Sequence, residues 1–161
     1  METLLPLASS AAGLLKARGE TIAVSQSSVG GLVSAALIAQ AGASAFFLGG
    51  AVIYTREAGR ALLQVNRAAL EGKKPLTADY VAVMAEQFRA QMGADWALAE
   101  MGAAGPDGSP YGPAPGTAAL AVAGPQAKAE VISTGLSDRV ANMRAFGAAA
   151  LTQLIGCLED A

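Results

Sequence analysis

One stretch near the amino terminus restricts the fold more than any other, because residues 21–37 run from a strand through a glycine turn into a helix. Residues 21–24 are β-branched or small and apolar, which predicts a buried strand, and residues 32–41 are rich in good helix formers. The turn between them, residues 26–31, contains two serines and two adjacent glycines. A strand that continues through such a turn into a helix is typical of α/β folds.

This turn has two interpretations. The first four N–H groups of a helix lack internal partners and the helix dipole is positive there, so the turn suits an anion or an oxyanion. It can also present a nucleophilic serine. Alternatively, glycine and serine only connect the strand to the helix, because glycine tolerates positive φ and serine caps helices. The residue types leave both interpretations open.

The length and hydropathy of the chain predict one domain, residues 1–161, with a sizeable core. Although 53% of the residues are hydrophobic, none of the segments reaches the roughly 18 uninterrupted apolar residues of a membrane span. The nearest, residues 32–53, is divided by glycines into a helix and a strand. Since the chain starts Met-Glu-Thr without a basic n-region, we expect a soluble, cytoplasmic protein without a membrane partner.

The net charge and the counts of cysteine and histidine limit the kinds of ligand and catalytic site that the chain can have. The net charge of −2 and the scattered lysines and arginines offer no electrostatic footprint for nucleic acid. The single cysteine, Cys157, cannot form an internal disulfide, and the lack of histidine excludes the usual zinc sites and histidine-based triads. We expect neither a metal nor a cofactor, and any hydrolytic chemistry must use Ser, Thr, Tyr, Lys, Arg or carboxylate side chains.

The apolar spacing predicts the order of the elements. Helices are expected over residues 2–18, 56–65 and 78–92 and after Ser137 or Asp138, and strands over residues 45–54, 96–100, 117–123 and 127–133. The α-β-α-β-α-α-β-β-β-α order predicts an α/β fold, a three-layer α/β/α sandwich with a mixed, mostly parallel sheet. Tyr80 and Met84 lie at helical spacing and are expected in the core. The loop at residues 101–116, rich in glycine and proline, is expected to be functional or disordered.

Five motifs in collinear order resemble the CinA C-terminal domain family, the nicotinamide-nucleotide amidohydrolases. They are residues 21–31, 47–54, 102–108, 115–117 and 137–139. The resemblance implies an α/β/α domain that hydrolyses the carboxamide of nicotinamide mononucleotide to nicotinic acid mononucleotide and ammonia. It also implies a small-molecule nucleotide as partner and a homo-oligomer, most commonly a dimer.

The resemblance implies roles for particular residues. Amide hydrolysis needs a nucleophile, a base and donors for the developing oxyanion. The family's serine corresponds to Ser27, and the tyrosine of its Tyr-Ser-Asn-Glu-Ala-Lys motif corresponds to Tyr54. Backbone N–H groups of Ser28, Gly30 and Gly31, and of Gly102 and Gly105, are expected to hold an oxyanion or the phosphate. Arg139 is expected to bind the phosphate in bidentate fashion.

The chain departs from the family's motif at the position of the catalytic base. The motif lysine is replaced by Gly59, which has no side chain to act as a base, and the adjacent Arg60 carries a cationic guanidinium that cannot take the serine proton. Gln26, Val29 and Met101 also replace polar or charged residues of the family pattern.

Two hypotheses follow from these departures. In the first, the chain is an amidohydrolase in which Tyr54, Glu57, Lys73 or Lys74 activates Ser27. In the second, it is a catalytically inactive relative with a binding, regulatory or assembly function.

Structural roles remain open for the same residues. Ser27 is otherwise a helix N-cap, Tyr54 a core aromatic, and Arg139 a surface residue in the first turn of the last helix. Arg144 lies five residues after Arg139, so the two need not face one pocket. Asp107 and Ser109, in the long loop, are either ligand contacts or ordinary turn residues.

Overall fold

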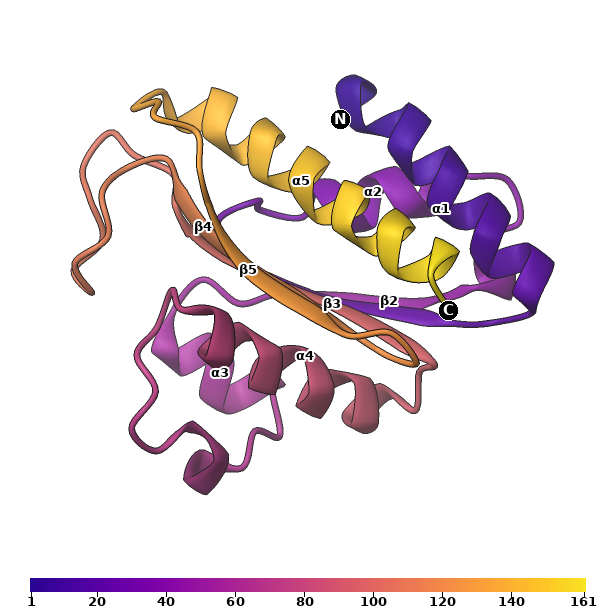
Figure 1. Cartoon of the computed structure of the whole chain (residues 1–161), viewed down its shortest axis with the longest axis horizontal. Helices are drawn as coiled ribbons and strands as arrows, with labels where there is room; N and C mark the ends of the chain where they lie inside the picture. The colour runs from indigo at the N-terminus through magenta and orange to yellow at the C-terminus, as the bar shows by residue number, and fades with distance from the viewer.

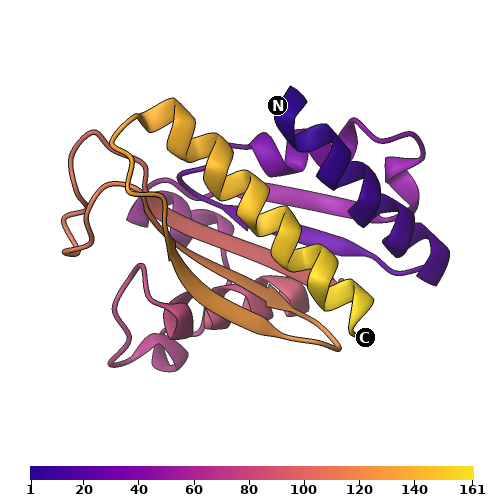
Figure 2. The same cartoon turned by 45° about the horizontal axis from the view of Figure 1, so that its top comes forward.

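The computed structural model describes the backbone of residues 1–161 and every side chain except that of Arg67. Five helices, five strands and three short 3-10 helices occur in the order η1 (Glu2–Leu4), α1 (Leu5–Arg18), β1 (Ile22–Gln26), α2 (Leu32–Ile38), η2 (Ala43–Ala45), β2 (Phe47–Val52), α3 (Arg56–Leu62), η3 (Arg67–Leu70), α4 (Ala78–Met92), β3 (Trp96–Ala103), β4 (Thr117–Ala123), β5 (Lys128–Ser133) and α5 (Arg139–Glu159). Figures 1 and 2 show three layers, with α1, α2 and α5 on one face of the sheet and α3 and α4 on the other.

The sheet has the strand order β2-β1-β3-β4-β5. β1 pairs in parallel with both β2 and β3, whereas β4 is antiparallel to β3 and to β5. Because two antiparallel steps restore the original direction, β5 runs the same way as β1, β2 and β3, and β4 alone is reversed. The three-layer α/β/α sandwich with a mixed, mostly parallel sheet is therefore confirmed.

Two buried clusters hold the layers together. Since successive strand residues point to opposite faces, Leu120 and Val122 of β4 pack in the cluster under α1, α2 and α5, whereas Ala119 and Ala121 face α4. Trp96 and Phe146 are completely buried in the first cluster. Across the described part of the chain, the helices are too short or too polar to cross a bilayer.

Local signals placed most helix ends correctly. Gly19 and Gly93 end α1 and α4 in the left-handed conformation that glycine favours. The Thr55 hydroxyl accepts the Ala58 N–H at 3.1 Å, and the Asp138 carboxylate accepts the Ala141 N–H at 2.7 Å. These capping contacts confirm the predicted starts of α3 and α5.

Several predicted boundaries were wrong. The helix expected over residues 32–41 ends at Ile38, and the one expected over 56–65 ends at Leu62. The strand expected over 45–54 covers only Phe47–Val52. β3 continues to Ala103 instead of ending at residue 100, because β4 pairs with it from Ala97 to Ala103. The pairing partner, which is distant in sequence, decided the length of this strand.

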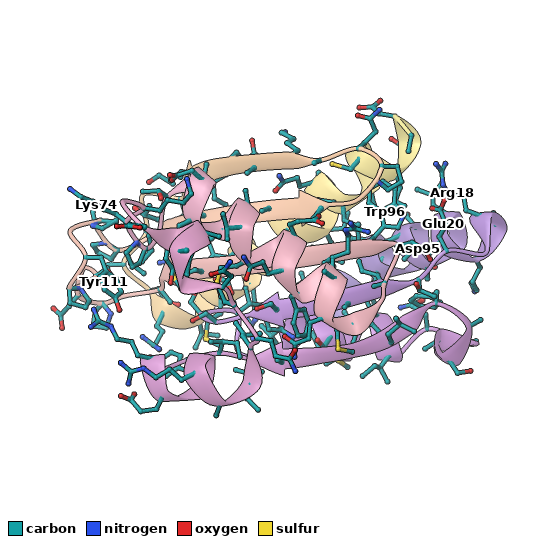
Figure 3. The ribbon with its side chains drawn as sticks, turned by 90° about the horizontal axis from the view of Figure 1, so that it is seen from below. Arg18, Glu20, Lys74, Asp95, Trp96 and Tyr111 are labelled. Atoms are coloured by element: carbon teal, nitrogen blue, oxygen red, sulfur yellow. The ribbon has the colours of Figure 1, made fainter. Side chains whose placement is uncertain are left out.

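The amino-terminal ends of β1 and β3 are joined by polar contacts. The indole Nε1 of Trp96 donates to the Glu20 carboxylate at 2.7 Å, and Glu20 also accepts from Arg18 at 3.0 Å. The Asp95 carboxylate accepts from the N–H and the hydroxyl of Thr21 at 2.8 and 2.7 Å. Figure 3 shows Arg18, Glu20, Asp95 and Trp96 together at one end of the molecule, with Tyr111 at the other.

The predicted irregularity at Gly49 and Gly50 is confirmed. The register of β1 and β2 shifts so that Ile22 and Ala23 pair with Phe47 and Gly49, leaving an extra residue in β2. A Cβ on Gly50 would collide with the Ser34 hydroxyl and lie 3.2 Å from the Val24 carbonyl oxygen. β2 therefore approaches α2 and β1 too closely for any side chain at Gly50.

We predict that Gly50→Ala lowers the free energy of unfolding by about 1–3 kcal/mol, because the added methyl group overpacks the contact with Ser34. Gly13→Ala is the matched control: Gly13 lies inside α1 with open space around it, so alanine should stabilise the helix by about 0.5–1 kcal/mol. Urea unfolding of both variants measures the difference. Equal stability of Gly50→Ala and the native chain would contradict the close approach.

Candidate functional site

A cavity of about 740 Å³ lies where the three neighbouring parallel strands end. Ser27 follows β1, Tyr54 follows β2, and Gly102 lies at the end of β3; all three residues line the cavity. Its other walls come from α3, from the segment that leads into α4, and from the loop through Tyr111. The carboxyl ends of parallel strands are the usual place for a ligand in an α/β sheet.

The Ser27 turn is held by a buried carboxylate. Glu100 of β3 is 3% exposed, and its Oε2 accepts the Ser27 N–H at 2.9 Å and the Val29 N–H at 3.1 Å. Its Oε1 accepts a hydrogen bond from the Ser28 hydroxyl. Glu100 thus fixes the backbone on both sides of Ser28 and positions Ser27 at the cavity wall.

Burial raises the pKa of the Glu100 carboxyl above its ordinary value of 4.5, and the hydrogen bonds from Ser28, Val29 and Ser27 oppose that rise. The direction means that the cost of desolvating the charge exceeds the gain from the donors around it. Protonation of Glu100 is correspondingly easier in the folded protein than in the unfolded chain.

Two N–H groups of the turn are engaged inside the protein, although the turn was expected to offer its N–H groups to an oxyanion. The Val29 N–H donates to Glu100, and the Gly30 N–H donates to the Ser27 carbonyl at 3.1 Å. Gly30 and Gly31 are not among the described residues that line the cavity. Both have positive φ, and Gly31 is the N-cap of α2. In this structure the two glycines shape the turn.

The helix-capping alternative for Ser27 was wrong, because the N-cap of α2 is Gly31. Gln26 supports the start of this helix instead: its Oε1 accepts the Val33 N–H at 3.2 Å, and its Nε2 donates to the Ser34 hydroxyl. Within the described part of the chain, the Ser27 hydroxyl forms no hydrogen bond. Ser27 is half-buried and faces the cavity, so its hydroxyl is open to a ligand.

Tyr54 and Arg139 lie together on the cavity wall. Arg139 is the first residue of α5, and its guanidinium donates to the Tyr54 hydroxyl at 2.6 Å and to the Gly105 carbonyl at 2.8 Å. Tyr54 is 63% exposed, so the core-aromatic alternative was wrong. Three residues that the sequence singled out separately are therefore in direct contact.

Gly102 and Gly105, two of the predicted site residues, line the cavity at positions where the chain is too crowded for a side chain. A Cβ on Gly102 would lie 2.6 Å from the Ser28 hydroxyl and 2.9 Å from the Phe146 ring. Gly105 has φ +101°, and a Cβ there would collide with the Ser137 carbonyl. By contrast, a Cβ on Gly59 would meet only Ile53, at 3.6 Å, so this wall of the cavity has room for a side chain.

The cavity is cationic and aromatic although the chain is acidic. All three tyrosines of the protein, Tyr54, Tyr80 and Tyr111, line it. Among its described lining residues, four are cationic and Asp107 is the only acid; the cations are Arg56, Arg60, Lys73 and Arg139. Such a lining suits an anionic ligand that carries a flat ring.

The candidate bases for Ser27 are differently placed. Glu57 is exposed, forms an ion pair with Arg60 at 3.6 Å, and does not line the cavity; neither does the exposed Lys74. Lys73 lines the cavity and forms an ion pair with Asp79 at 3.4 Å. Of the candidate bases other than Tyr54, only Lys73 lines the cavity and can approach a ligand.

Sequence reasoning missed four residues of the site. Glu100 could have been found, because a lone carboxylate inside the apolar run of residues 96–101 must have buried partners. Tyr80 was expected in the core; it packs on the cluster under α4 and also lines the cavity, where burial raises its pKa. Arg56 and Tyr111 carried no local signal, since their contact joins α3 to the long loop.

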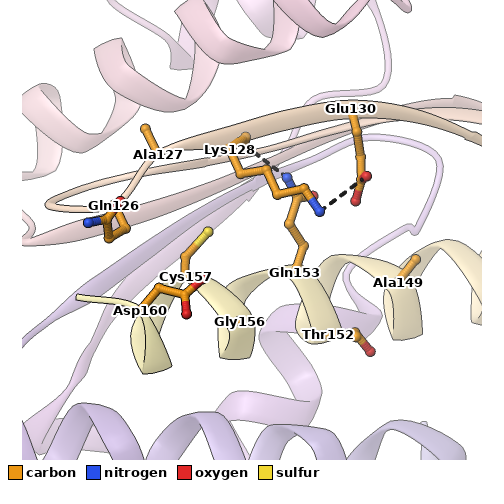
Figure 4. Close-up of a pocket in the computed structure, with 10 residues that line it drawn as sticks. All are labelled: Gln126, Ala127, Lys128, Glu130, Ala149, Thr152, Gln153, Gly156, Cys157 and Asp160. Atoms are coloured by element: carbon orange, nitrogen blue, oxygen red, sulfur yellow. Dashed lines mark hydrogen bonds and ion pairs between the residues drawn. The ribbon is translucent and has the colours of Figure 1, made fainter.

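A second cavity, of about 450 Å³, lies between β5 and the carboxyl-terminal half of α5 (Figure 4). The Gln153 amide donates to the Lys128 carbonyl at 2.8 Å, and the Lys128 ammonium forms an ion pair with Glu130 at 3.3 Å. Burial raises the pKa of the Cys157 thiol, which disfavours the reactive thiolate. None of the predicted site residues lines this cavity.

Comparison with known proteins gives a consistent result. A family model described as the CinA C-terminal domain matches residues 5–158. A CinA-like protein of Prochlorococcus marinus (strain MIT 9313) is 42% identical over 119 residues, which are 74% of this chain and 28% of that protein. A CinA-like protein of Parasynechococcus marenigrum (strain WH8102) is 35% identical over 153 residues, 95% of this chain and 35% of that protein. The chain thus spans about a third of the length of these curated relatives.

Solved structures agree with the fold. The crystal structure of a competence-damaged protein (CinA) superfamily protein from Klebsiella pneumoniae 700603 has a TM-score of 0.88 and 30% identity, and the match covers 97% of this chain and 98% of that chain. The competence/damage inducible protein CihA from Agrobacterium tumefaciens has a TM-score of 0.85 and 28% identity, with 96% and 94% covered.

The burial of Glu100 predicts that the stability of the protein depends on pH. Because the folded protein binds the Glu100 proton more tightly than the unfolded chain, the free energy of unfolding should fall as the pH rises from 4.5 through the raised pKa. Glu100→Gln should abolish this dependence while keeping an acceptor for the two N–H groups. Glu100→Ala should lower the free energy of unfolding by about 2–4 kcal/mol, since it leaves those two N–H groups without an acceptor. Urea unfolding of the three proteins across this pH range tests the prediction, which fails if Gln and Ala lose equal stability.

Proposed function

The chain belongs to the CinA C-terminal domain family, and on that premise we propose that its cavity binds a pyridine mononucleotide such as nicotinamide mononucleotide. The observation that carries the proposal is the cavity at the carboxyl ends of β1, β2 and β3, whose described lining includes Ser27, three tyrosines and four cationic side chains. Family membership supplies the class of ligand, and the lining supplies the chemistry that recognises it.

The lining matches the parts of such a nucleotide. A pyridinium ring is flat and cationic, so it is attracted to the face of a tyrosine ring. A phosphate is attracted to a guanidinium, and Arg139 is well suited to it because Tyr54 and Gly105 already hold its side chain in place. The opposite charges of the two groups favour one orientation of the nucleotide in the cavity.

In this proposal Ser27 faces the carboxamide. Its hydroxyl is the nucleophile that amide hydrolysis requires, and Glu100 holds its backbone in place. A base that takes the hydroxyl proton is missing at Gly59, and Glu100 is already occupied by the turn. A base is typically worth about 10²–10⁴ in rate, so we propose that the chain binds the nucleotide and hydrolyses it slowly or not at all.

A second candidate function is efficient amide hydrolysis with a relocated base. Lys73 favours it, because this side chain lines the cavity from the segment before α4. A lysine amine near a serine hydroxyl can act as its base once it loses its proton. The ion pair with Asp79 would have to open for this to happen.

The test is ammonia release from nicotinamide mononucleotide by the native chain, Ser27→Ala, Gly59→Lys and Lys73→Met. We expect little turnover by the native chain and a rise of about 10²-fold or more in Gly59→Lys, which restores an amine where a Cβ has room. Gly59→Met is the matched control, with similar length and no amine. Ser27→Ala removes only the hydroxyl, because the contact with Glu100 is made by the backbone N–H.

Rapid turnover by the native chain, lost in both Ser27→Ala and Lys73→Met, would establish the second candidate. Failure of the native chain to bind nicotinamide mononucleotide in calorimetry would contradict the proposed function itself.

A further inference from the structure

Arg56 forms a contact across the cavity, and a nucleotide phosphate bound at Arg139 leaves this arginine without an assigned group of the ligand. It is the first residue of α3, and its Nε donates to the Tyr111 hydroxyl at 3.3 Å. The guanidinium also lies over the Tyr111 ring, 5.5 Å from its centre. Both residues line the cavity, one from the helix and the other from the long loop.

The same arrangement occurs at Arg139. Its guanidinium donates to the Tyr54 hydroxyl and lies 6.0 Å from the centre of the Tyr54 ring. The cavity therefore contains two arginine–tyrosine pairs, which come from the β2–α3 connection, the long loop and the start of α5. Each pair offers a positive charge next to an aromatic ring.

These two arginines carry the least compensated charge in the cavity. Arg60 has Glu57 at 3.6 Å and Lys73 has Asp79 at 3.4 Å, so both of those charges have a carboxylate beside them. In the part of the chain that the structure describes, the side-chain partners of Arg56 and Arg139 are neutral tyrosines, and no ion pair includes either arginine. Asp107 alone adds negative charge among the described lining residues.

We propose that the cavity recognises a ligand with two separate anionic groups, one bound at Arg139 and the other at Arg56. The proposal rests on the proposed function in taking this cavity as a nucleotide site. A nucleotide phosphate supplies one anion. The second anion is either a carboxylate on the ring, as in nicotinic acid mononucleotide, or a further phosphate, as in a nucleoside diphosphate.

The size of the cavity agrees with a ligand larger than one charged group and one ring. Its volume of about 740 Å³ lies in the upper half of the roughly 300–1,000 Å³ range of small-molecule sites. Separate cationic groups also fix the orientation of a ligand with two anions better than a single group can. The second anion would therefore add both affinity and specificity.

The experiment is calorimetric titration with two matched pairs of ligands that differ by one negative charge. The pairs are nicotinamide mononucleotide against nicotinic acid mononucleotide, and AMP against ADP. We expect the native chain to bind the more anionic member of at least one pair about tenfold more tightly. Arg56→Gln should abolish that preference and weaken binding of the less anionic member less than about threefold. Arg56→Lys should retain most of the preference, because it keeps the charge.

Arg144→Gln is the matched control, because Arg144 is exposed on α5 and does not line the cavity. Equal binding of both members of each pair would overturn this inference while leaving the proposed function standing, and so would an equal loss for both members in Arg56→Gln. A preference for ADP that depends on Arg56, without binding of either pyridine nucleotide, would support the second anion and contradict the proposed function.

Discussion

The site depends on one buried carboxylate. Glu100 lies inside β3 and accepts hydrogen bonds from the turn that follows β1, so it joins the ends of two neighbouring strands. In an interior of low dielectric constant such contacts are strong, and an unpaired partner is costly. The turn therefore has little freedom to change its shape, and Ser27 stays at the cavity wall. Gly102 allows this contact, because a side chain at that position would displace the Ser28 hydroxyl.

This arrangement separates structural donors from those that remain for a ligand. The N–H groups of Val29 and Gly30, which looked like anion-binding groups, are engaged inside the protein. The charge that faces the cavity comes instead from α3, from the first residue of α5 and from the segment before α4. A protein with a net charge of −2 thereby presents a cationic cavity, since what attracts a ligand is the local field rather than the total charge.

The similarity to the CinA family and the residue at position 59 concern different properties of the chain. The family match, the TM-scores and the close backbone contacts at Gly50, Gly102 and Gly105 all concern the framework. The framework is maintained by packing, in which even one added methyl group is felt. Gly59 lies at a position with open space, where packing places little restriction on the residue. The residue at position 59, and with it the chemistry of this cavity wall, can therefore change without destabilising the fold.

The sequence by itself determined the fold class, the order of the elements and the cap at Thr55, and it narrowed the cap of α5 to Ser137 or Asp138, because these depend on residues a few positions apart. It also singled out Ser27, Tyr54 and Arg139 as candidate site residues, and all three line the cavity. Tertiary structure decided the full length of β3, the role of Glu100 and the Arg56–Tyr111 contact. The physical reason is separation along the chain: Glu100 lies 73 residues from Ser27, and Arg56 lies 55 residues from Tyr111. Periodicity and capping report local geometry, whereas such partners are set only when the sheet brings its strand ends together.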